Sequence, residues 1–395
     1  MPENNRIFSR NFILVTLVAA GSFASFQFGM TVIPLYALSM GGSQWDVGLT
    51  AGMIALSSTP ARLFAGRFSD RMGRRPILFI GAGFLVLTGL LYFATPNIPS
   101  LLIVRLIHGI GFGAVHTIAT ILIADIVPKN RWGEGQGYFT AFSLLSLAVS
   151  PALGFVLYSK LGYVSVFAVT LAITLVTLLL CFFVPETGKK EAKTPSAASG
   201  RSFLEKGALL PATILALTTW GHGVTVAFIP VFSIERHILN PGLYFTMLAV
   251  IGVVSRGFVG RLSDRYGRGF VLVPGLLAAM SGLVALHFTT NTPMLMLSGM
   301  LFGLGFSTVS PVVLALTGER VKPERRGTAM GMVSASNDLG IMAGSFMGGL
   351  IVAESGFSFI FLLAGSLLLV AVAVFLVTVR REMKSMFRLS AAREQ

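Results

Sequence analysis

The sequence GRFSDRMGRRP at residues 66–76 decides the fold, because it is a strongly charged island between two long apolar runs. A second island, GRLSDRYGRG at residues 260–269, repeats it at an offset of 194 residues. Glycines at both ends of each island permit a tight chain reversal, and the arginines favour the cytoplasmic side of a membrane. We therefore predict that each island is a short inner loop between two membrane-spanning helices.

The composition indicates an integral membrane protein. Of the 395 residues, 54% are hydrophobic and 12% are charged, and the charged share is about half that of a soluble protein. A helical span needs roughly 20 apolar residues, and the pattern predicts an all-α fold with twelve transmembrane helices. The predicted spans lie at about 11–38, 46–65, 76–95, 99–125, 135–159, 164–184, 208–233, 241–259, 270–289, 293–317, 328–353 and 356–379.

The distribution of lysine and arginine predicts the orientation. With the N-terminus inside, 25 of the 30 basic residues fall in inner segments, and only Lys160 and Arg236 fall in outer loops. This asymmetry places both termini in the cytoplasm of a multi-pass protein of the cell membrane. It also explains the net charge of +14 without a nucleic-acid partner. The first apolar stretch is too long for a signal peptide.

The repeat extends well beyond the two islands. At the same offset of 194 residues, Arg62 matches Arg256 and Asp125 matches Glu319. Six spans separate equivalent positions, so the two halves have the same orientation, as in transporters with a site between their halves. We expect a first six-helix half at 1–184, a cytoplasmic linker at 185–207, a second six-helix half at 208–380 and a tail at 381–395.

Residues 66–75 resemble motif A of the major facilitator superfamily, which lies between spans two and three. The resemblance covers essentially the whole chain and implies the major facilitator fold. It also implies that Asp70, Arg74 and Asp125 form a charge cluster that latches an inner gate; the alternative is a solvated loop that only fixes topology. The residues concerned are Gly66, Asp70, Arg71, Gly73, Arg74, Arg75 and Asp125, with Asp264, Arg268 and Glu319 in the second half.

Span four contains a second pattern, with Leu101, Arg105, His108, Gly109, Gly111 and Gly113. It resembles motif B of the same family, except that His108 stands where the family usually has glutamine. An arginine in a membrane costs at least roughly 2.5 kcal/mol unless it meets a partner or a cavity. The resemblance implies a part for Arg105 in proton coupling. The alternative is a structural arginine that binds backbone carbonyl groups.

Span five resembles motif C, which in the family is characteristic of efflux antiporters. The small residues form a stripe that lets two helices approach closely, and a proline adds a bend. Close packing alone would also explain the stripe, so two interpretations remain open. The residues of the stripe are Gly137, Ser146, Ser150, Pro151 and Gly154.

Asp338 is the one acidic residue predicted near the middle of a span. Burial favours the protonated form of a carboxyl group, so Asp338 is a candidate for proton coupling. The alternative is a structural contact with Asn337 or with a distant arginine. Other polar or amphipathic side chains at depth are candidates for the substrate cavity, although histidines also form hydrogen bonds between helices. These candidates are Gln27, His108, His116, Trp220, His222 and Asn337.

These features predict a secondary active transporter that is not an enzyme and has no cofactor or metal. The sequence lacks a metal-ligand spacing and a phosphate-binding loop, so a proton or sodium gradient is the expected energy source. We expect a monomeric, proton-coupled antiporter in the lipid bilayer that exports a small organic molecule such as a drug, sugar or metallophore. Because Arg105 and His108 would make the expected cavity basic, we expect an anionic or zwitterionic substrate. The alternatives are a proton symporter for uptake and a membrane sensor that does not transport.

Overall fold

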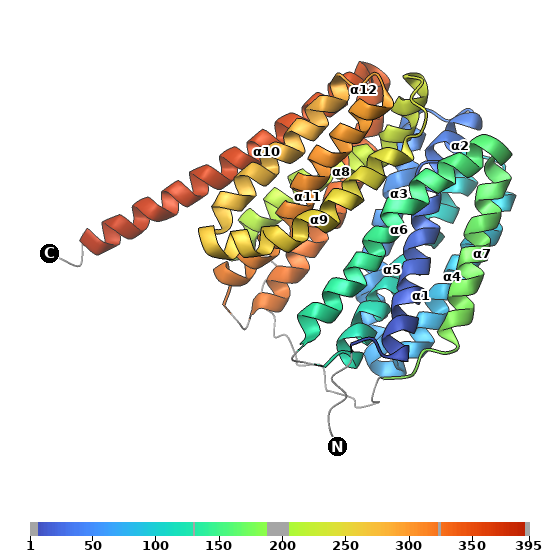
Figure 1. Ribbon diagram of the computed structural model, residues 1–395, viewed down its shortest axis with the longest axis horizontal. Helices are drawn as coiled ribbons and strands as arrows, with labels where there is room; N and C mark the ends of the chain where they lie inside the picture. The colour runs from blue at the N-terminus through green and yellow to red at the C-terminus, as the bar shows by residue number, and fades with distance from the viewer. Residues whose placement is uncertain (1–6, 129–130, 188–204, 323–324, 392–395) are drawn as a thin grey trace.

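The structure is a computed structural model that describes residues 7–128, 131–187, 205–322 and 325–391. Every regular element in these residues is a helix (Figure 1). The first half contains α1 (Arg10–Phe28), α2 (Ile33–Ser39), α3 (Gln44–Met72), α4 (Arg74–Leu91), the 3-10 helix η1 (Tyr92–Ala94), α5 (Ile98–Ile126), α6 (Trp132–Leu161) and α7 (Tyr163–Cys181). The second half contains α8 (Lys206–Glu235), α9 (Gly242–Tyr266), α10 (Arg268–His287), α11 (Thr292–Arg320) and α12 (Arg326–Ala391). Most of the predicted linker lies outside the described residues.

Helix composition confirms most of the predicted spans, but not all twelve. In the described part of the chain, nine helices are long and apolar enough to cross a membrane. Helices α3 and α9 are not among them, and the described apolar stretch of α9, Gly242–Arg256, is shorter than a full span. Helix α12 covers both of the last two predicted spans, so these two spans are one of the nine helices. The non-helical backbone of Gly356 separates them. The chain is thus an all-helical, multi-pass membrane protein.

Four glycines with positive φ repeat the 194-residue offset in the backbone. Gly73 (φ 97°) joins α3 to α4, and Gly267 (φ 90°) joins α9 to α10. Gly162 and Gly356, both with φ 77°, break the chain at equivalent places on the opposite side of the bundle. Residues with a Cβ atom rarely adopt such φ values. We use these turns to name the two ends of the bundle, the Gly73 end and the Gly162 end.

Helix starts repeat in the same way. The side chain of Asn97 accepts a hydrogen bond from the backbone N–H of Ser100 at the start of α5. Asn291 accepts the equivalent bond from Met294 at the start of α11. Such caps satisfy backbone donors that the helix itself leaves free and stabilise a helix by about 1 kcal/mol. Local sequence thus specifies where equivalent helices of the two halves begin.

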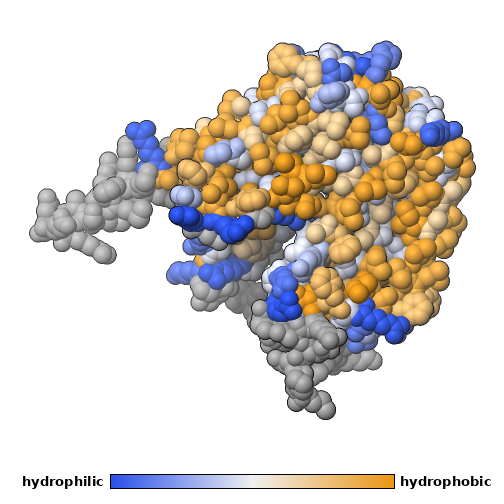
Figure 2. Space-filling model, in the orientation of Figure 1, coloured by the Kyte–Doolittle hydropathy of each residue, from blue (hydrophilic) through white to orange (hydrophobic). Residues whose placement is uncertain are grey.

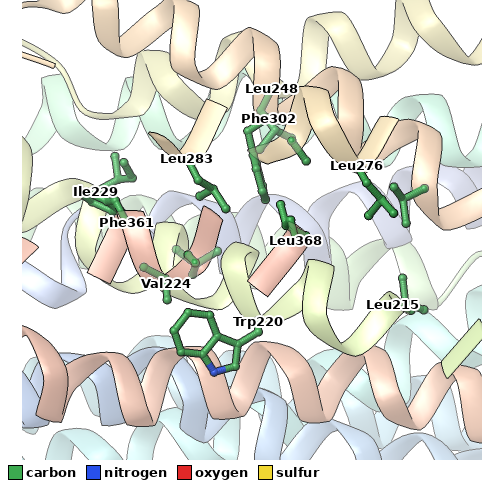
Figure 3. Packing of buried hydrophobic residues seen from close by; sticks show 14 of the residues in the cluster. Leu215, Trp220, Val224, Ile229, Leu248, Leu276, Leu283, Phe302, Phe361 and Leu368 are labelled. Atoms are coloured by element: carbon green, nitrogen blue, oxygen red, sulfur yellow. The ribbon is translucent and has the colours of Figure 1, made fainter. Parts of the chain in front are cut away.

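Each half has its own tightly packed interior. In the first half, Gly109 of α5 lies against Ile54 and Ser57 of α3 with no room for a side chain. In the second half, Gly303 of α11 occupies the equivalent place against Leu248 of α9. Figure 3 shows the apolar side chains of α8, α9, α10, α11 and α12 that fill the second half. Glycines at these crossings permit the close helix approach that membrane packing uses.

Two seams join the halves. In the first seam, α3 packs on α12, where Gly48 lies against the Ser345 carbonyl and the rings of Trp45 and Phe346 are 6.0 Å apart. In the second seam, α6 packs on α9, where Gly242 lies directly against the backbone of Ala152. All of these contacts are close to the Gly162 end.

The halves separate toward the Gly73 end. The ribbons of α6 and α9 approach each other at the top of Figure 1 and diverge toward the bottom, and Figure 2 shows a surface hollowed between the halves at the lower edge. The large hydrophobic cluster that spans both halves draws its buried first-half members from near the Gly162 end or mid-membrane. These are Met30, Leu35, Val47, Ala51, Leu147 and Phe155. The structure is therefore closed at the Gly162 end and open at the Gly73 end, and we call the open space the vestibule.

Candidate functional site

The charge cluster at the Gly73 end combines residues from three parts of the first half. Arg74 donates a hydrogen bond of 2.7 Å to Asp70, one helical turn before it, and its Nε lies 3.5 Å from Asp125 of α5. The hydroxyl group of Thr187 also donates to Asp125, at 2.7 Å. Asp70 is mostly exposed, and exposed ion pairs contribute only about 0–1 kcal/mol. The cluster therefore fixes geometry more than it adds stability.

Glu186 is a member of this site that the sequence did not reveal. Its carboxylate accepts hydrogen bonds from the backbone N–H groups of Arg74 (2.8 Å) and Arg75 (3.0 Å). These are the first residues of α4, and the N-terminus of a helix attracts negative charge. A Cβ atom on Gly73 would approach the Glu186 carboxylate to 2.6 Å. The only sequence signal was one acidic residue two positions after the sixth predicted span.

The remaining residues of the motif make simpler contacts. Arg75 donates to the backbone carbonyl of Phe182 at 2.7 Å, which ties α4 to the chain after α7. Arg71 is exposed in the last turn of α3. A Cβ atom on Gly66 would meet no described atom within 4 Å, so packing against the described residues does not require glycine there.

The second half has an equivalent cluster. Arg268 contacts Glu319 of α11 through Nε (2.9 Å) and Nη2 (2.8 Å). It also donates to the hydroxyl group of Ser263 at 3.0 Å. The side chain of Asp264, which the sequence assigned to the same cluster, lies outside the described part of the chain. A Cβ atom on Gly267 would meet no described atom within 4 Å, so among the described residues this turn has no close neighbour like Glu186.

Asp338 lies on α12 and joins the two halves. Its Oδ2 accepts a hydrogen bond of 2.9 Å from the hydroxyl group of Thr59 on α3, and Arg62 of α3 lies 3.8 Å away. The neighbouring Asn337 donates to Oδ1 at 3.0 Å. Asp338 is only 8% exposed. The contacts with Asn337 and with a distant arginine are those of the structural alternative, but the contact with Arg62 crosses the seam between the halves.

Arg105 is buried in the first half, away from the seams. It donates to the backbone carbonyl of Thr50 at 2.6 Å and approaches the hydroxyl group of Tyr92 at 3.4 Å. Tyr92 also lies 3.1 Å from Nδ1 of His108, whose Nε2 has no hydrogen-bond partner among the described residues. In the described residues Arg105 forms no ion pair. These contacts match the alternative of a structural arginine bound to backbone carbonyl groups.

The contacts among the described residues do not bring the remaining cavity candidates together at one site. Gln27 is buried in α1, and its Oε1 has no hydrogen-bond partner in the described structure. His116 of α5 lies among aromatic rings of the first half and within electrostatic range of Arg62. His222 of α8 lies against the ring of Phe306, 4.7 Å between centroids.

Trp220 belongs to the packed interior of the second half. It is a member of the large hydrophobic cluster, and Figure 3 shows its indole ring beside Val224 and close to a neighbouring helix. Its backbone carbonyl contacts Gly344 of α12 so closely that no side chain would fit there. The described residues contain no group of three or more His, Cys, Asp or Glu side chains that could hold a metal ion.

The stripe in α6 packs against α1 over part of its length. Gly154 lies against the backbone of Phe28, the hydroxyl group of Ser146 donates to the Ala20 carbonyl at 3.2 Å, and Thr31 donates to the Pro151 carbonyl at 2.9 Å. Ser150 is buried as well, whereas a Cβ atom on Gly137 would meet nothing within 4 Å. Close helix packing thus accounts for the middle and the end of the stripe.

Comparison with known proteins agrees with this architecture. The family model described as Major Facilitator Superfamily matches residues 12–255 and 238–393, which together include nearly all of the chain. The chain belongs to the major facilitator superfamily. Its fold is also similar to the crystal structure of the nucleoside transporter NupG, with a TM-score of 0.78, 14% identity, and coverage of 93% of this chain and 99% of NupG.

Curated relatives of this superfamily member include proteins named for drug efflux. The chain is 26% identical over 342 residues to the multi-drug resistance efflux pump PmrA homolog of Lactococcus lactis, covering 82% of this chain and 84% of that protein. It is 25% identical over 385 residues to the multidrug resistance protein MdtG of Escherichia coli, covering 91% and 92%. The chain is thus a transporter of the major facilitator superfamily with efflux-like relatives.

Proposed function

We propose that this transporter is a proton-coupled antiporter that exports a small organic molecule across the cytoplasmic membrane. The names of its relatives support export. The excess of lysine and arginine in the predicted inner segments supports cytoplasmic termini, which would make the Gly73 end the cytoplasmic end. The vestibule would then be open to the cytoplasm, where a molecule to be exported is taken up. We also propose that the protein is a monomer. Its parts would be a first half at 1–184, a linker at 185–207, a second half at 208–380 and a tail at 381–395.

The observation that carries the proposal is the contact of Asp338 with α3. An ionised Asp338 attracts Arg62 across the seam, and a proton on the carboxyl group removes this attraction. The Thr59 hydroxyl and the Asn337 amide can hydrogen-bond to either form of the carboxyl group. Proton binding at Asp338 would therefore change the free energy that holds α3 and α12 together. Such a change is what couples proton movement to the relative motion of two halves.

The charge clusters at the Gly73 end would act at another stage of the same cycle. We propose that Asp70, Arg74 and Asp125 form one side of a latch that closes the vestibule from the cytoplasm, and that Arg268 and Glu319 form its equivalent. Glu186 would hold the start of α4 in place for this contact.

Flux into inverted membrane vesicles with an imposed pH gradient tests the proposal. A panel of drugs, sugars and metallophores should include a compound that accumulates when the vesicle interior is acidic. Asp338→Asn should abolish this pH-driven flux while the protein still reaches the membrane. Unchanged pH-driven flux in D338N would remove Asp338 from the mechanism. Flux that runs with the proton, in the direction of uptake, would favour the symporter.

A further inference from the structure

The two seams between the halves are equivalent in sequence position but not in charge. On α3, Thr59 and Arg62 face Asp338 of α12. The offset of 194 residues takes these positions to Val253 and Arg256 on α9 and to Leu144 on α6. Leu144 and Val253 line one cavity of about 370 Å³ between α6 and α9. The second seam therefore has the arginine of the first seam without its carboxylate.

Arg256 lies well inside the membrane-spanning part of α9. It is 10 residues from the end of that helix at Tyr266, and at about 1.5 Å per residue this is about 15 Å along the axis. Val253, one turn before it, faces α6 in the cavity of the second seam. Gly252 faces Ser307 of α11. Since side chains three and four residues apart share a helix face, Arg256 lies between these two directions, toward the vestibule.

The charge of Arg256 has no partner in the described structure. Its side chain is exposed, and no carboxylate of the described residues forms an ion pair with it. Arg62 shares its charge with Asp338, and Arg105 is enclosed by Thr50 and Tyr92. A charged residue at this depth in a membrane is a functional-site candidate by default, because contact with lipid costs free energy that a partner or a water-filled cavity must offset.

We propose that Arg256 binds the anionic group of the transported molecule, so that the substrates are organic anions. This inference rests on the proposed transport function and names its substrate class. Arginine suits the role because its planar guanidinium group pairs with carboxylate or phosphate through two hydrogen bonds. In the second seam the bound anion would occupy the place that Asp338 occupies in the first seam. Substrate binding would therefore neutralise the charge of Arg256, as Asp338 neutralises the charge of Arg62.

The test measures binding by the full chain in detergent with two fluorescent probes that share a xanthene ring system. Fluorescein carries negative charge at neutral pH, and rhodamine 123 carries positive charge. Fluorescence polarisation gives their affinities for the wild type, R256Q, R256K, L144D and L144N. Leu144→Asp places a carboxylate on the protein where the first seam has Asp338, and Leu144→Asn is the matched control without charge. Thermal unfolding shows which variants are folded.

The wild type should bind fluorescein more tightly than rhodamine 123. Arg256→Gln and Leu144→Asp should each weaken fluorescein binding by about tenfold or more, equivalent to about 1.4 kcal/mol. Leu144→Asn should stay within about threefold of the wild type, and Arg256→Lys should lose less than Arg256→Gln because it keeps the charge. If Arg256→Gln does not fold, the difference in fluorescein affinity between L144D and L144N tests the proposal instead.

Each of the following results would overturn the inference. They are absence of fluorescein binding or a preference for rhodamine 123, an affinity in folded R256Q within about twofold of the wild type, and equal effects of L144D and L144N. Displacement of fluorescein by phosphatidylglycerol but not by benzoate would assign Arg256 to a lipid headgroup and would also overturn it. Binding in detergent does not depend on a pH gradient, so failure of proton coupling in vesicles is a separate result.

Discussion

At the scale of single residues, the contacts of Arg105 show that a residue of a family motif can have a structural role. Its guanidinium group joins α5 to the Thr50 carbonyl on α3 and to Tyr92 in η1. A guanidinium group that is buried with its hydrogen bonds made stabilises the packing of three elements, although the charge itself is costly to bury.

We expect Arg105→Ala to lower stability and transport together. The change removes charge-assisted hydrogen bonds, each contributing about 1.5–3 kcal/mol, and leaves a cavity. Thermal unfolding in detergent and flux in vesicles measure the two effects. Tyr92→Phe is the control, because it removes only the hydroxyl group and should cost less. An R105A protein with wild-type stability that has lost only its proton coupling would contradict this interpretation.

Sequence reasoning at this scale identified acidic and basic residues but not their partners. Asp338 was recognisable as an acid within an apolar run. Its contact with Thr59 crosses 279 positions of the chain, and no local pattern encodes a contact of that kind. Glu186 was missed for a related reason, because its role depends on where the chain after α7 returns to α4.

At the scale of secondary-structure elements, the start of α4 depends on a residue from outside the helix. Loss of a helix cap costs about 0.5–2 kcal/mol, and Glu186 also opposes the partial positive charge of the helix N-terminus. Glu186→Ala should therefore lower the unfolding temperature, and Glu186→Gln should have a smaller effect because its oxygen still accepts a hydrogen bond. Thermal unfolding compares them. Equal stability of E186A and the wild type would show that solvent replaces the carboxylate.

The two glycine turns form a natural matched pair. Alanine at either Gly73 or Gly267 imposes a positive φ on a residue with a Cβ atom, at a cost of about 1 kcal/mol or more. Only at Gly73 does the new Cβ atom also meet the Glu186 carboxylate. We expect Gly73→Ala to destabilise the protein more than Gly267→Ala, as measured by thermal unfolding of both variants. A larger loss of stability in Gly267→Ala than in Gly73→Ala would mean that Glu186 moves away from the new Cβ atom without lowering stability.

The sequence predicted the elements well because their signals are local. Apolar runs and glycine turns each act within a few residues, and the repeat predicted the same signals twice. The break between the last two predicted spans is present as well, because the backbone of Gly356 within α12 is not helical.

At the scale of the whole molecule, the closed Gly162 end depends on close backbone contact between the halves. Gly242→Ala would place a Cβ atom against Ala152 of the other half, so we expect the halves to separate at this end and transport to fall several-fold. Distances between spin labels on α6 and α9 measure the separation. Gly252→Ala on the same helix is the control, because its Cβ atom would lie at an ordinary 3.6 Å from Ser307. Equal transport by both variants would exclude this seam as a gate.

The sequence predicted two equivalent halves, but it did not predict which end of the molecule would be closed. Both conformations of an alternating transporter use the same helices and the same topology. The choice depends on small differences in packing between surfaces that are far apart in the chain, such as those of Gly242 and Ala152.

The unequal seams imply that acid acts on only one side of the molecule. The seam of α6 and α9 is joined by hydrogen bonds from Thr246 and Asn240 to the backbone carbonyl groups of Ala148 and Ala152, and neither bond involves a carboxylate. The seam of α3 and α12 contains the contact of Arg62 with Asp338, which the proposed proton on Asp338 would weaken. A cell in acid would therefore loosen this transporter along one edge and leave the other edge closed.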